Sequence, residues 1–200
     1  LFRGSFDAAA AAALVGYPPH TPATVFAVLP ELSSQSLVVA DSGTRLRLLD
    51  TFRDYGAHKL ADRGDQQACA EHHAAQYKDL AEQALVGRRT GRRREWLSIL
   101  LAEQTNLLGA LENAKHLGQE RRVVSMVGAL AWFWLDTGQI TEASRWFHEA
   151  LPVLDDASPT QRARVLGLGS AIADLTGDLS LGAAYLEEAL DAAAEDELLH

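Results

Sequence analysis

The sequence predicts a mainly α-helical protein with one β-hairpin near its N-terminal end and repeated α-hairpins toward its C-terminal end. Two β-favouring runs flank Asp41-Ser42-Gly43, whose composition suits a tight turn. Elsewhere, apolar residues recur at the spacing that is typical of amphipathic helices. A glycine-centred pattern at Gly138 recurs 39 residues later at Gly177, which indicates stacked repeats.

The composition bounds the class of protein. The chain has 200 residues and is 48% hydrophobic, enough for a substantial core in one domain or two small ones. Its longest apolar runs are too short to cross a membrane. Its single cysteine, Cys69, excludes an internal disulfide framework and favours a reducing compartment, so we expect a cytoplasmic protein. Because the chain begins at Leu1 and its one methionine is Met126, we expect a fragment of a longer protein.

The net charge of −9 is distributed unevenly along the chain. Residues 1–60 carry 5 Lys and Arg against 5 Asp and Glu, residues 61–122 carry 10 against 9, and residues 123–200 carry 3 against 13. The acidic C-terminal part is therefore not expected to bind nucleic acid nonspecifically.

Two short helices are predicted before the hairpin. The first begins at Asp7 and ends near Gly16, and a break follows at Tyr17-Pro18-Pro19. The second begins near Ala23, and Pro30 is expected to split or kink it.

The hairpin forms the centre of the first predicted module. Its strands are expected at residues 37–39 and 45–49. With two helices before it and one after, it is the wing of a small winged-helix-like module over residues 1–62. The first helix of that module is expected to lie before Leu1.

The helix after the hairpin has its own start and stop signals. Asp50 or Thr51 is the predicted N-cap, and Gly64 is the predicted stop. One apolar side is expected to carry Phe52, Tyr55 and Leu60.

Residues 63–122 form a predicted helical connector. One helix is expected from Gln66 to about Leu85 and another from about Arg93 to Leu117, with Gly87 and Gly91 in the loop between them. Apolar residues recur along one side of the second helix: Trp96, Leu100, Leu107, Leu111 and Ala114.

Residues 123–200 form the predicted repeats. Gly138 and Gly177 each end a helix, expected at residues 123–137 and 161–176, and let the chain reverse into the next helix. The small residues Ala143 and Gly182 then allow the paired helices to approach closely. Stacked α-hairpins of this kind form a tetratricopeptide-like solenoid.

Six sequence segments follow one another in an informative order: FRGSFDAAAA, LPELSSQSLVV, TRLRLLDTFRDYGAHKL, EHHAAQYKDLAEQA, EWLSILLAEQTNLLGALENAK and ALAWFWLDTGQITEASRWFHEAL. In this order they resemble bacterial transcriptional regulators of the STAND ATPases (signal-transducing ATPases with numerous domains), found especially in actinobacteria. The resemblance covers nearly the whole chain. It implies a parent protein with an upstream P-loop domain and a DNA-binding domain of LuxR type or antibiotic-regulator type at one terminus. The winged helix would then join ATPase and sensor rather than read DNA.

The chain departs from the complete pattern of that family because it contains no GxxxxGK[ST] phosphate loop. No cofactor is therefore expected in this chain, and the ATP or ADP of the parent would bind upstream. The expected partners are other domains of the parent and a protein or small-molecule effector. DNA would bind only through a separate domain, and no membrane is expected to bind.

A metal site is the first chemical candidate, since Cys69, Glu71, His72 and His73 lie close together in the sequence. Cys69 and His73 share a helix face at i, i+4, but two of four ligands are a weak signal. A buried cysteine with solvent-facing histidines is the simpler interpretation. No catalytic residue is expected either, because neither a GxSxG elbow nor a glycine-rich oxyanion segment is present.

Five arginines form a candidate basic loop: Arg88, Arg89, Arg92, Arg93 and Arg94. They could contact nucleic acid or nucleotide phosphates. Pairing with nearby carboxylates is the simpler interpretation, because no aromatic residue is interleaved with them for base stacking. The wing offers only Arg45 and Arg47 against Asp41, and residues 23–36 contain no Lys or Arg. Direct DNA binding by this module is therefore not expected.

Two further sets of residues are regulatory candidates. Arg53, Asp54 and Tyr55 form either an interdomain switch or simply an exposed helical turn. Aromatic residues form a candidate binding site on the repeat surface: Trp132, Trp134, Trp146 and Phe147, with Phe133 beside them. Consecutive aromatic residues cannot all face one side of a helix, so some could line a binding surface, and packing between hairpins is the alternative.

Three interpretations of function follow. The preferred one is a non-catalytic regulatory segment, not an enzyme, that binds an effector on its helical repeats and relays this through the winged-helix joint to an upstream ATPase. The second is a standalone tetratricopeptide-type scaffold that assembles protein partners. The third is a winged-helix DNA-binding unit with the repeats as its effector domain.

Overall fold

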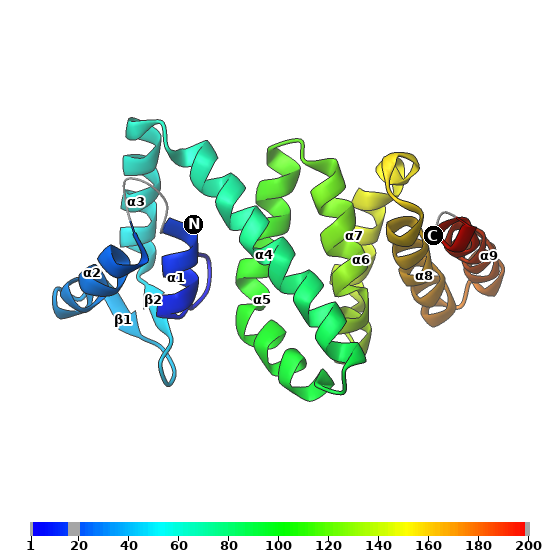
Figure 1. Ribbon diagram of the computed structural model, residues 1–200, viewed down its shortest axis with the longest axis horizontal. Coiled ribbons are helices and arrows are strands. Elements are labelled where there is room, and N and C mark those ends of the chain that lie inside the picture. The colour runs from blue at the N-terminus through cyan, green and yellow to red at the C-terminus, as the bar shows by residue number, and fades with distance from the viewer. Residues whose placement is uncertain (1, 16–20, 199–200) are drawn as a thin grey trace. The chain divides into compact units, whose positions relative to one another are not determined.

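The computed structural model describes residues 2–15 and 21–198, and these residues are mainly α-helical with one small antiparallel sheet (Figure 1). The chain divides into two compact units. The wing unit consists of Leu1–Leu80 and Ser98–Leu117, and the hairpin unit consists of Ala81–Leu97 and Gly118–His200. The predicted fold class is confirmed. The predicted division at residues 62 and 122 stays a prediction.

The elements of the wing unit are α1 (Ala8–Val15), α2 (Pro22–Ser34), β1 (Val38–Ala40), β2 (Leu46–Leu48), α3 (Asp50–Arg63) and parts of α4 (Gln66–Arg89) and α5 (Arg93–His116). Asp7 starts α1 as predicted, because its Oδ1 accepts a hydrogen bond from the Ala10 amide at 2.6 Å. Thr21 caps α2 in the same way, with its Oγ1 accepting from the Thr24 amide at 3.2 Å. The predicted break at Tyr17-Pro18-Pro19 lies outside the described residues.

Pro30 lies inside α2, which runs on to Ser34. Pro30 therefore does not split this helix, and the alternative of a kink stays a prediction. Proline removes one backbone donor from a helix, and at this position both Pro30 and Phe26, four residues earlier, are exposed. Water can satisfy the carbonyl that loses its partner, so the helix continues.

The β-hairpin confirms the predicted wing. β1 and β2 pair antiparallel, with Val38 opposite Leu48 and Ala40 opposite Leu46, and Gly43 in the turn has a φ of +56°. Phe6 adds an isolated bridge to Leu46 through backbone hydrogen bonds of 2.8 and 2.7 Å. The segment before α1 is thereby attached to the wing.

Residues at its two ends determine where helix α3 begins and where it ends. Leu49 is the N-cap, with an extended backbone and no side-chain capping bond, so the prediction of Asp50 or Thr51 is wrong by at least one residue. Asp50 is already helical and places its carboxylate in the first turn, where the helix dipole favours negative charge. Gly64 ends the helix as predicted, with a left-handed φ of 75°.

The apolar side of α3 differs from the predicted one. Phe52 and Leu60 line the same hollow together with Gly56, at the i, i+4, i+8 spacing of one helix face. Tyr55 is 61% exposed and lies off that face, so its place in the predicted apolar side is wrong.

The connection between α4 and α5 is shorter than predicted. Gly87 is not in a loop but buried inside α4, where an added Cβ would lie 1.7 Å from Nε1 of Trp96. Only residues 90–92 separate the two helices, and Gly91 in this turn has a φ of +82°. Gly87 is therefore required because the Trp96 side chain approaches its backbone closely, and not because the chain turns there.

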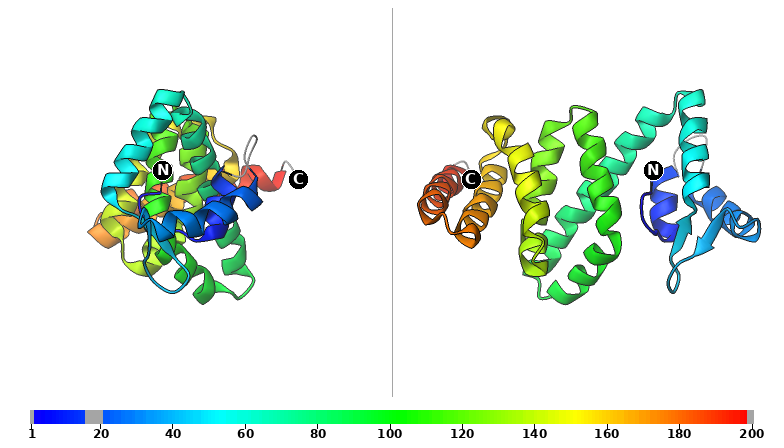
Figure 2. Two further views of the ribbon diagram at one scale, coloured as in Figure 1. Left: turned by 90° about the vertical axis from the view of Figure 1, so that its left-hand side faces the viewer. Right: turned by 180° about the vertical axis from the view of Figure 1, so that it is seen from behind.

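The elements of the hairpin unit, besides the ends of α4 and α5, are α6 (Glu120–Thr137), α7 (Ile140–Ala150), the 3₁₀ helix η1 (Leu151–Asp156), α8 (Pro159–Thr176) and α9 (Leu179–Leu198). Gly138 and Gly177 end α6 and α8 in left-handed conformations, with φ of 69° and 91°. This confirms both predicted helix ends. Helices α8 and α9 lie side by side (Figure 2).

Close approach of the paired helices is also confirmed. Ala143 in α7 is completely buried, and a Cβ added to Gly182 in α9 would lie 2.2 Å from Oδ1 of Asp174. The helical hairpins are consistent with a solenoid, and their tetratricopeptide-like classification stays a prediction. No helix within residues 2–15 and 21–198 has both the length and the apolar character needed to cross a membrane.

Candidate functional site

An apolar hollow of about 510 Å³ lies in the wing unit. Side chains from α1, α2, both strands and α3 line it, and all but a few of them are apolar. Neither α2 nor α3 contains a buried residue, and Phe26 and Phe52 are exposed. The apolar sides of these two helices therefore remain available for contact.

Two of the three predicted switch residues lie away from this hollow. Arg53 lines the hollow and pairs with Asp50 at 3.1 Å. Asp54 is exposed, and its backbone carbonyl is 2.8 Å from Nδ1 of His58. Tyr55 lies under the ammonium group of Lys59, 5.5 Å from the ring centroid. The three residues do not form one site, and their role as a switch stays a prediction.

A buried polar cluster joins the wing to α4 and α5. It is formed by Arg45, Tyr77, Glu103 and Asn106. Arg45 precedes β2 and pairs with Glu103 of α5, with 2.6 Å between Nη2 and Oε1. The other carboxylate oxygen of Glu103 accepts hydrogen bonds from the Tyr77 hydroxyl at 2.7 Å and from Nδ2 of Asn106 at 2.9 Å. The glutamate is thus fully engaged by one charged and two neutral donors.

The same cluster fixes the chain before α1. Oδ1 of Asn106 accepts hydrogen bonds from the amides of Arg3 and Gly4, each at 3.0 Å. The Ser5 carbonyl accepts from Nδ2 of Asn106 at 2.8 Å and from Nη2 of Arg45 at 2.6 Å. Burial first, and then the charge of Glu103, raises the pKa of Tyr77, so the phenol keeps the proton that it donates. The cluster therefore joins three parts of the wing unit: the N-terminal segment, the wing and α5.

His73 is the buried titratable side chain nearest this cluster. Its ring packs between Phe2, at 6.0 Å, and Tyr77, at 4.7 Å between centroids. Burial, together with the positive charge of Arg3, lowers the pKa of His73 to about 3. The predicted solvent-facing position is thus wrong for His73, whereas His72 is exposed.

The candidate metal ligands are not brought together. Cys69 and His73 are both buried on the same side of α4. No group of three or more His, Cys, Asp or Glu side chains placed to hold a metal ion occurs in the described part of the chain.

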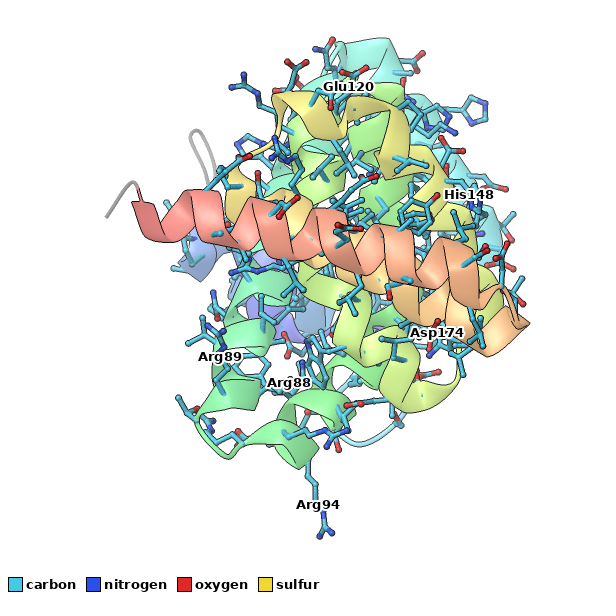
Figure 3. All side chains as sticks on the ribbon, turned by 90° about the vertical axis from the view of Figure 1, so that its right-hand side faces the viewer. Arg88, Arg89, Arg94, Glu120, His148 and Asp174 are labelled. Atoms are coloured by element: carbon cyan, nitrogen blue, oxygen red, sulfur yellow. The ribbon has the colours of Figure 1, made fainter. Side chains whose placement is uncertain are left out.

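The five arginines lie on two helix ends rather than in one loop. Arg88 and Arg89 belong to α4, Arg93 and Arg94 to α5, and only Arg92 lies in the turn between them. The predicted basic loop is therefore corrected to a basic turn with its flanking helix ends. Figure 3 shows Arg94 extending away from the ribbon at this end of the unit.

Several of these arginines already have partners. Arg92 donates from Nε and Nη2 to both oxygens of Glu95, at 2.8 and 2.5 Å. Arg93 donates in the same way to Asp136, at 2.8 and 2.5 Å. The guanidinium of Arg88 lies 5.5 Å from the ring centroid of Trp132. Hydrogen bonds to these carboxylates raise the pKa of Arg92 and of Arg93. The contacts of Arg88, Arg92 and Arg93 are therefore explained by pairing within the hairpin unit.

The aromatic residues predicted for a repeat surface are all buried: Trp132, Phe133, Trp134, Trp146 and Phe147. The ring of Phe147 packs edge-on against Tyr185, with 5.3 Å between centroids. The rings therefore pack between helices, and a role in ligand binding has no support from their positions.

Sequence reasoning missed the polar cluster because its members come from distant parts of the chain. Glu103 and Asn106 lie three residues apart on one helix face that is otherwise apolar, at Leu100, Leu107 and Ala110. Polar residues on a core-facing stripe were the signal that could have found it.

The fold defines an α-helical protein with a wing-bearing unit and a unit of stacked helical hairpins. Over 174 residues, the sequence of this chain is 28% identical to that of a Mycobacterium bovis protein and to those of Mycobacterium tuberculosis proteins from two strains. Each of these relatives is named "Putative HTH-type transcriptional regulator". The match covers 86% of this chain and 19% of each relative. No protein-family model matches the chain, and no solved structure matches it significantly.

Proposed function

We propose that this chain is a non-catalytic regulatory segment of a transcriptional regulator. The observation that carries the proposal is its similarity, across 86% of its residues, to proteins named as regulators of this type. Because the chain spans only 19% of those relatives, the activity of the whole protein is part of the proposal. In the proposed function, the hairpin unit binds a protein or small-molecule effector in the cytoplasm.

The ion pairs of the wing favour a structural role over a role in reading DNA. Arg45 forms an ion pair with Glu103, with 2.6 Å between Nη2 and Oε1, and Arg47 forms one with Asp41, with 3.5 Å between Nε and Oδ1. A wing that reads DNA needs its cations for phosphates. DNA is therefore bound through a separate domain of the parent protein.

The wing unit has features suited to a joint between domains. Its apolar hollow, with Arg53 at the edge, offers contact area for another domain of a longer protein. The polar cluster holds the wing and the N-terminal segment in one arrangement. The joint relays the state of the hairpin unit to an upstream ATPase domain of the STAND type, which binds the ATP or ADP.

The test is an in-frame chromosomal deletion of the codons for residues 1–200, followed by RNA sequencing. We expect the levels of a limited set of transcripts to change and to return when the intact gene is supplied in trans. An unchanged set of transcripts, under growth conditions in which the intact gene is expressed, would contradict the proposed function.

A further inference from the structure

We draw no further inference here: the strongest candidate, the apolar hollow that α1, α2, the two strands and α3 line in the wing unit, carries nothing further, because no feature of the described residues shows what covers it.

Discussion

Replacing Arg45 by methionine tests the buried polar cluster of the wing unit. The side chains of Arg45 and Glu103 are only 18% and 8% exposed, and their charged atoms are 2.6 Å apart. Breaking a buried ion pair by removing one partner typically costs about 3–5 kcal/mol. Glu103 keeps its hydrogen bonds from Tyr77 and Asn106, so we expect a loss near the lower limit, about 3 kcal/mol.

The assay for this prediction is urea unfolding, with hydrogen exchange of the amides in β1 and β2 to locate the loss. Arg47→Met is the matched control, because Arg47 lies two residues away and its ion pair with Asp41 is 3.5 Å long between half-exposed side chains. Exposed pairs of this kind contribute about 0–1 kcal/mol. Equal losses for the two variants, or a loss below about 1 kcal/mol for Arg45→Met, would refute the role given to the cluster.

Three further predictions concern His73, the helix contact at Gly169, and DNA binding. His73 stays neutral in the folded protein, with a pKa of about 3 against 6.5 when unfolded, so the unfolded chain alone takes up this proton as the pH falls between these values. His73→Phe should therefore reduce the loss of unfolding free energy at acid pH by up to about 1.4 kcal/mol per pH unit. An added Cβ on Gly169 would lie 2.4 Å from Cζ of Phe147, whereas one on Gly167 would meet nothing within 4 Å. In urea unfolding, Gly169→Ala should therefore cost about 1–3 kcal/mol, and Gly167→Ala should stabilise the fold by up to about 1 kcal/mol. Electrophoretic mobility shift should detect no complex of this chain with duplex DNA at about 150 mM salt, and a discrete shifted band would contradict the assignment of the wing.

The predictions that succeeded rest on local chemistry. Gly138 and Gly177 end helices because a left-handed residue closes the last turn, and Asp41-Ser42-Gly43 turns the chain between strands for a similar reason. Each signal lies within a few residues of the structure that it determines. The mainly helical fold followed from such signals.

The features that were missed depend on contacts between distant segments. Gly87 looks like a loop residue until Trp96 is seen to occupy the space beside it. His73 looks exposed on a polar stretch until Phe2 and Tyr77 enclose it. Sequence periodicity gives the face of a helix, and tertiary packing decides what that face meets.

We propose that this chain takes part in transcriptional regulation without reading DNA itself. The most direct measurement is fluorescence anisotropy of the whole chain with labelled duplexes from the promoters whose transcripts change when residues 1–200 are deleted, at about 150 mM salt. We expect binding no tighter than the nonspecific range, weaker than about 10⁻⁶ M. Tighter and sequence-selective binding to those promoters would contradict it and would make the wing unit a DNA-binding module.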